Sequence, residues 1–207
     1  MFSDQDLAVM DSIIKRYPRS RSAIMPLLHY VQSKAGYVTN EGIELIAKLL
    51  TIETAEVSAV ATFYTQYKRK PVGEYHVGVC TNTLCAVMGG DAIFAGLKEH
   101  LGIENDGVTA DGKVSLEHIE CNAACDYAPV VMANWEFYDN QTVQSSKDLV
   151  DSMRQGNPTP PTRGPKSLPT WKENSAVLAG INDGRANEGV QAGEPTLLGL
   201  KLAKEGK

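Results

Sequence analysis

Apolar residues in the first 70 positions recur three and four apart, which is the spacing of one face of an α-helix. Ser3 with Asp6 and Thr39 are typical helix starts, and Gly36 is a typical stop. Because each predicted helix has only one apolar face, the helices are expected to pack together as a bundle. The four stripes are Leu7, Met10, Ile14 and Tyr17; Ile24, Leu27, Leu28 and Val31; Ile43, Ile46, Ala47 and Leu50; and Val57, Val60, Ala61 and Tyr64.

The pattern changes near Pro71, where runs of β-forming residues begin. The last helix of this region is predicted to start at Ser145 and to stop at Gly156. The order strand, helix, three strands, helix is that of a small α/β or α+β domain. The predicted strands are 73–80, 116–121, 129–135 and 136–140, the last two as a hairpin, and the predicted helices are 90–101 and 145–156.

Proline content sets the end of the chain apart. Five prolines crowd the sequence NPTPPTRGPKSLP directly after Gly156, which favours extended structure over helix. From about 170 onward there are only weak helical stretches among many glycines. The chain is therefore predicted to have three parts: a helical bundle at 1–70, an α/β domain at 71–156 and an extended Pro-rich tail at 157–207.

The net charge of −5 is unevenly distributed over these parts. The first has 9 basic and 7 acidic residues, the second 4 and 13, and the third 7 and 5. A solvated acidic surface explains such a middle segment. Alternatively, the segment docks against a basic partner or sets the potential of an anionic centre. The excess of acidic over basic residues argues against a nucleic-acid-binding protein, which usually has a basic face. No apolar run has the length of a membrane span and no signal-peptide core is present, so we expect a soluble intracellular protein without direct membrane insertion.

All four cysteines lie in the acidic part, as the pairs Cys80–Cys85 and Cys121–Cys125. Each pair begins where a predicted strand ends, which is where functional loops gather in α/β sheets. Four cysteines are too few for a disulfide scaffold of this length. The pairing therefore indicates one ligand set.

Several centres compete for these ligands. A zinc site usually has two residues between paired cysteines, whereas here there are four and three. A dithiol redox site needs C-x-x-C, which is absent, and a Rieske centre needs histidines beside the cysteines. His76 and His118 lie within predicted strands and are expected to be structural. Spacing favours a 2Fe-2S cluster, with zinc as the alternative.

Loop N–H groups at 81–84 and 122–124, and the helix opening at Gly89 and Gly90, are candidate donors to the sulfurs of such a cluster. No G-x-G-x-x-G or Walker sequence occurs, so no nucleotide site is predicted.

Four segments resemble one known family: VATFYTQY (60–67), VCTNTLC (79–85), DGKVSLE (111–117) and IECNAACDYAP (119–129). It is the small thioredoxin-like 2Fe-2S subunit of the NADH-dehydrogenase module of respiratory complex I, with relatives in NAD-linked hydrogenases and formate dehydrogenases. The resemblance implies an N-terminal helical bundle followed by a thioredoxin-like 2Fe-2S ferredoxin domain. It also implies that Cys80, Cys85, Cys121 and Cys125 ligate one 2Fe-2S cluster.

The resemblance further implies a hetero-oligomer. A partner flavoprotein would carry FMN and the NADH site, and this subunit would exchange electrons with that flavin within NADH:quinone oxidoreductase. No catalytic residue of its own is expected, so it would be an enzyme only as a subunit, peripheral on the inner face of the bacterial membrane or the equivalent matrix side. The alternatives are the same subunit in a hydrogenase or formate dehydrogenase, or a zinc-stabilised interaction module.

Two features depart from the minimal pattern of that family. Ala123 stands where a glycine is expected, which restricts the backbone of the second cysteine loop. The tail is longer, and PTRG (161–164) resembles extensions that lie on the flavoprotein. We therefore expect this Pro-rich strap to be extended and partner-bound.

Overall fold

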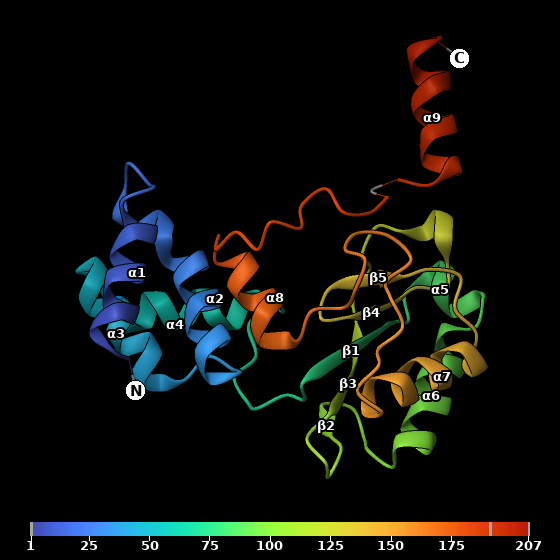
Figure 1. The fold of residues 1–207 in the computed structure, drawn as a ribbon, viewed down its shortest axis with the longest axis horizontal. Coiled ribbons are helices and arrows are strands. Elements are labelled where there is room, and N and C mark those ends of the chain that lie inside the picture. The colour runs from blue at the N-terminus through green and yellow to red at the C-terminus, as the bar shows by residue number, and fades with distance from the viewer. Residues whose placement is uncertain (1, 191, 207) are drawn as a thin grey trace. The chain divides into compact units, whose positions relative to one another are not determined.

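The computed structural model describes residues 2–190 and 192–206, which form two compact units (Figure 1). The helical unit comprises the residues up to Val72 together with Pro169–Asp183. The sheet unit comprises Gly73–Leu168 and the residues from Gly184 onward. The expected tail is thus divided, because 169–183 pack in the helical unit and the rest belongs to the sheet unit.

All four helices predicted in the first 70 residues are present. Ser3 and Asp6 form a reciprocal capping box at the start of α1, and the Thr39 hydroxyl accepts the backbone N–H of Gly42 at the start of α3. Gly36 ends α2 in the left-handed conformation, with φ 87°. The elements of this unit are α1 (Asp4–Ile14), η1 (Ser20–Ala23), α2 (Ile24–Ala35), α3 (Asn40–Leu50), α4 (Thr54–Phe63) and α8 (Trp171–Leu178).

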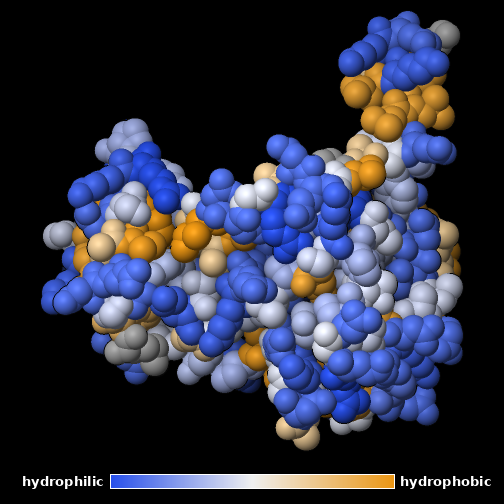
Figure 2. Space-filling model, in the orientation of Figure 1, coloured by the Kyte–Doolittle hydropathy of each residue, from blue (hydrophilic) through white to orange (hydrophobic). Residues whose placement is uncertain are grey.

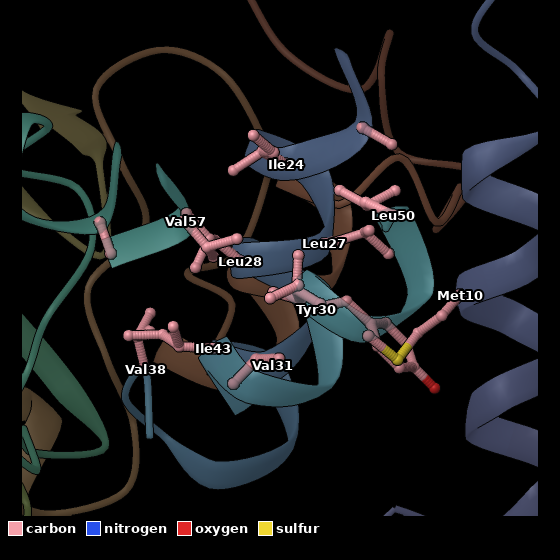
Figure 3. Close-up of a cluster of buried hydrophobic side chains, with 14 of the residues drawn as sticks. Met10, Ile24, Leu27, Leu28, Tyr30, Val31, Val38, Ile43, Leu50 and Val57 are labelled. Carbon is pink, nitrogen blue, oxygen red and sulfur yellow. The ribbon is translucent and has the colours of Figure 1, made fainter. Parts of the chain in front are cut away.

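The apolar stripes of these helices meet in one core, part of which is drawn in Figure 3. Each fully buried leucine or isoleucine contributes about 1.5–3 kcal/mol to stability relative to an exposed one. Tyr17 and Tyr64 were also predicted to be core positions, but both are exposed because they lie past the ends of α1 and α4. The central members are Met10, Ile13, Leu27, Leu28, Val31, Ile46 and Val57.

Helix α8 differs from the extended tail expected after Gly156. Its Trp171 side chain is buried and donates from Nε1 to the backbone oxygen of Gly36 at 2.7 Å. Thr170 and Glu173 form a capping box at its start. That T-x-x-E signal opens a helix, and the surrounding prolines and glycines obscured it.

The sheet unit is built on five strands in the order β2-β3-β1-β4-β5. Strands β1 and β3 run parallel in register from Tyr75 opposite Val114 to Cys80 opposite Ile119, and the other neighbours are antiparallel. The strands are β1 (Tyr75–Cys80), β2 (Gly107–Val108), β3 (Val114–Ile119), β4 (Val131–Ala133) and β5 (Glu136–Tyr138); the helices are α5 (Thr83–Val87), α6 (Gly90–Leu101), η2 (Cys125–Tyr127), α7 (Val143–Arg154) and α9 (Glu194–Lys204).

Alternate residues of the strands serve two separate cores. Val77 and Val79 of β1 pack with α6 and α7, which lie next to each other against the sheet in Figure 1. Cys80, Ile119 and Met132 belong to a second core, together with residues of the loop before β4. The cysteine end of β1 therefore sits in its own apolar setting.

Three local features differ from the expectation. Helix α7 is capped by Thr142, and Ser145 is the reciprocal partner that accepts the Thr142 N–H at 2.9 Å. Strand β3 starts and ends two residues earlier than predicted, so Cys121 lies in the following loop. The short elements α5 and β2 had no periodic signal because each is five residues or fewer.

Among the described residues, no helix combines the length and the apolar character needed to cross a membrane. Helix α9 has no buried residue and exposes Leu197, Leu198, Leu200 and Leu202, which Figure 2 shows as an orange patch at the C-terminal end of the sheet unit.

Candidate metal centre

The four cysteines come together at one edge of the sheet. Cys80 is the last residue of β1, and Cys121 follows the end of β3 by two residues. Because β1 and β3 are adjacent and parallel, their carboxyl ends lie side by side. Cys85 is the third residue of α5, and Cys125 begins η2. Two cysteine-bearing loops thus start from neighbouring strand ends.

The two pairs differ in exposure. Cys80 and Cys85 are buried, with 2% and 3% of their surface accessible, whereas Cys121 and Cys125 are exposed. All four are free thiols. One side of the centre is therefore enclosed by the protein, and the other side faces outward from the chain.

The spacing of the sulfurs matches paired coordination. The Sγ atoms of Cys121 and Cys125 are 3.9 Å apart. Two thiolates on one tetrahedral metal with bonds of about 2.3 Å lie about 3.8 Å apart. Within the described part of the chain, no three His, Cys, Asp or Glu side chains converge as ligands of a single ion would. The Cys121–Cys125 pair therefore has the separation of two thiolates that share one metal atom.

The pKa values of the thiols show that the pairs influence each other. The pKa of Cys85 is raised to about 11, chiefly by burial and also by the neighbouring Cys80 and Cys125, while the backbone N–H of Val130 opposes the shift. The pKa of Cys125 is also raised, chiefly by Cys121. Both shifts favour the neutral thiol, and the positive charge of a bound metal would hold Cys85 and Cys125 as thiolates.

Donors for an anionic, sulfur-rich centre are present in the second loop. The backbone N–H of Ala123 points at Cys121 Sγ at 3.4 Å. Asn122 buries its Nδ2 atom without any protein acceptor. A buried amide donor with no partner carries a substantial desolvation cost, and cluster sulfurs are acceptors that would remove it. The residues therefore fit a 2Fe-2S group.

Ala123 adopts the conformation that its position demands. Its φ is 53°, in the left-handed region that glycine occupies freely and that costs an alanine about 1–2 kcal/mol. The backbone of this loop is therefore left-handed at Ala123, as is usual for glycine, although the residue carries a side chain.

The two glycines at the start of α6 have a packing role. Gly89 is the N-cap of α6 with φ 113°, and a Cβ on Gly90 would lie 2.5 Å from the carbonyl oxygen of Cys80. The missing side chain lets α6 begin directly against the backbone of the first cysteine pair.

The two strand histidines do not join the cysteines. His76 is buried, with Nε2 2.7 Å from Glu117 Oε2 and Nδ1 2.9 Å from Ser115 Oγ. His118 contacts Thr81 and the ring of Phe94. Both have structural partners, as the sequence indicates.

Sequence reasoning pointed to the loop at 122–124 but not to the Asn122 side chain, to Val130 or to Tyr127 at the end of η2. Asn122 lies between Cys121 and Cys125, so the sequence alone could have identified its side-chain amide as a candidate donor at the site. Val130 and Tyr127 had no sequence signal, because their relation to the cysteines depends on the folded loop.

Comparison with known proteins gives a consistent result. Residues 10–154 match the family described as thioredoxin-like 2Fe-2S ferredoxin. The chain is 59% identical over 194 residues to a subunit of the NADH-quinone oxidoreductase of Mycobacterium tuberculosis, covering 93% of this chain and 77% of the relative. It is 41% identical to the equivalent NADH-quinone oxidoreductase subunit of Rickettsia bellii over 156 residues, or 74% of this chain and 93% of that one.

Among solved structures, the fold is similar to that of an NAD+-reducing NiFe hydrogenase chain, with a TM-score of 0.57 and 18% identity. The match covers 66% of this chain and 23% of the hydrogenase chain. At that identity the likeness concerns the fold alone.

Proposed function

Because this chain belongs to the thioredoxin-like 2Fe-2S ferredoxin family, and within it resembles NADH-quinone oxidoreductase subunits, we propose that Cys80, Cys85, Cys121 and Cys125 ligate its cluster and that it exchanges electrons with the FMN of a partner subunit. The observation that carries the proposal is the meeting of two cysteine pairs at one sheet edge, one of them with its sulfurs 3.9 Å apart.

Each part of the site has a role in this proposal. A bound 2Fe-2S cluster supplies one-electron transfer. Cys80 and Cys85 anchor the enclosed side, and Cys121 with Cys125 forms the exposed side through which a partner's cofactor is approached. Val130, Ala123 and Asn122 provide N–H groups that stabilise negative charge on sulfur.

The chemistry of NADH oxidation belongs to the assembly. The partner is an FMN- and NADH-binding flavoprotein among the peripheral subunits of the complex, and the chain itself supplies no catalytic residue. The complex would place this subunit on the inner face of the bacterial membrane or the equivalent matrix side. The 59% identity to named NADH-quinone oxidoreductase subunits favours this assembly over a hydrogenase or formate dehydrogenase.

Metal analysis of the purified full chain tests the ligand set. We expect two irons and two acid-labile sulfides per chain, a red-brown colour and an EPR signal after reduction. Cys121→Ser should lose or strongly perturb that signal, while Ser146→Ala, a change in α7 away from the site, should retain it. Colourless protein with one zinc ion, or an unaltered signal in the Cys121 variant, contradicts the proposal.

Electron exchange with flavin is tested by adding NADH. The cluster should be reduced by NADH when the flavoprotein is present and should remain oxidised with NADH alone. Reduction of the isolated chain by NADH would show that the donor site is not on a partner.

A further inference from the structure

The tail of the sheet unit carries a rigid ion pair. Arg163 donates from Nε and Nη2 to the two carboxylate oxygens of Asp139, at 3.0 and 3.1 Å. Both side chains are largely buried, with 18% and 8% of their surface exposed. A bidentate pair in such a setting fixes the plane of the guanidinium.

That guanidinium stacks on two aromatic rings. Its central carbon lies 3.9 Å from the ring centroid of Phe137 and 5.1 Å from that of Tyr127. Both distances are within the range of a cation–π interaction. Tyr127 ends η2, two residues after Cys125, so Arg163 reaches from the tail to the loop of the second cysteine pair.

The backbone around Arg163 is held as well. Thr162 donates its N–H to the carbonyl oxygen of Phe137 at 2.9 Å, and residues 137 and 163 form an antiparallel bridge. The segment predicted as a partner-bound strap is thus extended, but it adds to the edge of β5 in its own chain. This backbone pairing sets the position from which Arg163 extends.

A second stretch of the tail contacts the same loop. Thr196 of α9 donates its hydroxyl to Asp126 Oδ2 at 3.1 Å. Gly193 crosses so close to the Tyr127 hydroxyl that a Cβ there would collide with it. Asp126 and Tyr127, the residues directly after Cys125, are therefore both held by residues from beyond 160.

We propose that the tail is an intramolecular clamp on the Cys125 loop, in which Arg163 is a positioning residue that fixes Tyr127 and, through it, the cluster ligand Cys125. The inference rests on the proposed ligation by Cys125. The clamp keeps the exposed cysteine pair in its ligating geometry and limits access of water and chelators. Lysine cannot replace Arg163, because it lacks both the bidentate fork and the flat face that stacks on the rings.

The test compares Arg163→Lys with Arg185→Lys in the purified holo-chain. Arg185 lies in the same tail and donates hydrogen bonds to Glu188 and Ser167. Arg163→Lys should release iron to a chelator roughly 5–30-fold faster than the unmodified chain and broaden the EPR signal. Arg185→Lys should leave both unchanged.

Tyr127 variants show whether Arg163 acts through the ring. Tyr127→Phe keeps the ring and should behave like the unmodified chain. Tyr127→Leu should release iron as fast as Arg163→Lys, and adding Arg163→Lys to it should have little further effect. Because Tyr127→Leu leaves the Arg163–Asp139 pair intact, it provides the test even where Arg163→Lys fails to fold.

Two results would overturn the clamp. One is an Arg163→Lys chain with unchanged iron release and EPR signal; the other is a full Arg163→Lys effect in the Tyr127→Leu background. Failure of the proposed function is recognised separately, because the unmodified chain would then contain no 2Fe-2S cluster.

Discussion

At the scale of single residues, the site combines buried thiols with N–H donors, one of which has no acceptor among the described residues. Burial opposes ionisation of Cys85, and the Val130 N–H favours it. Asn122 adds an amide nitrogen that is buried without an acceptor. Hydrogen bonds to sulfur stabilise the more negative, reduced form of a cluster. Under the proposed ligation we therefore expect these donors to raise its reduction potential, opposite to the effect of the acidic surroundings.

Asn122→Ala should therefore lower the midpoint potential of the cluster. Loss of a hydrogen bond whose strength differs by about 1 kcal/mol between the two oxidation states corresponds to about 40 mV for one electron. A dye-mediated redox titration followed by EPR measures this shift. Asn157→Ala, on an exposed residue beyond α7, is the matched control. An unchanged potential in Asn122→Ala would assign the amide no role at the cluster.

At the scale of elements, the sequence predicted the long periodic segments and missed those whose signals were short or distant. The stripes from Leu7 to Ala61 sufficed for four helices because one apolar face must be buried. Ser145 was mistaken for the helix cap because a serine at the third helical position has the same chemistry as one at the cap. The clamp could not be predicted, since Arg163 and Tyr127 are brought together only by the β5 edge.

The same distinction applies to the cysteines. Their arrangement at two strand ends was predictable because parallel neighbours end at one edge. Which pair is enclosed was not, because the burial of Cys80 and Cys85 comes from the loop before β4, whose path follows no local pattern.

The helical unit should lose stability as the pH falls from about 6.5 to about 4. Burial lowers the pKa of His29 in α2 from 6.5 to about 4, against a hydrogen bond with Gln66 that opposes the shift. Between pH 6.5 and about 4, His29 is therefore protonated in the unfolded chain but mainly neutral in the folded chain, and this difference lowers the free energy of unfolding. The stabilisation is complete above pH 6.5 and decreases by about 2–3 kcal/mol by pH 4.5.

Urea unfolding at pH 7.5 and 4.5, followed by circular dichroism, measures this loss. His29→Phe should remove most of the pH dependence, because phenylalanine is neutral in both states. His100→Gln, a change on the partly exposed face of α6, should leave it in place. A His29→Phe chain with the full pH dependence would assign it to other groups; Asp6, whose pKa is lowered chiefly by Lys34, titrates only below this window.

At the scale of the whole molecule, the tail contributes to both units and still leaves apolar surface uncovered. Trp171 is buried in the helical unit and Arg163 is ion-paired in the sheet unit, whereas α9 exposes four leucines. The match to the mycobacterial relatives spans 194 residues and so extends well into this tail. The tail is thus attached to the two units through Trp171 and Arg163, and the exposed leucines of α9 are suited to contact a partner subunit.

Limited trypsin digestion should therefore act on α9 first in the isolated chain. Lys201 and Lys204 are exposed there, whereas Arg163 is engaged by Asp139 and should resist cleavage. Adding the flavoprotein should slow cleavage at both lysines, because burial of the leucines removes the helix from the protease. Mass spectrometry of timed samples identifies the cut sites, with an unrelated protein at equal concentration as the control. Equal cleavage of α9 with and without the flavoprotein would mean that this helix is not part of the contact.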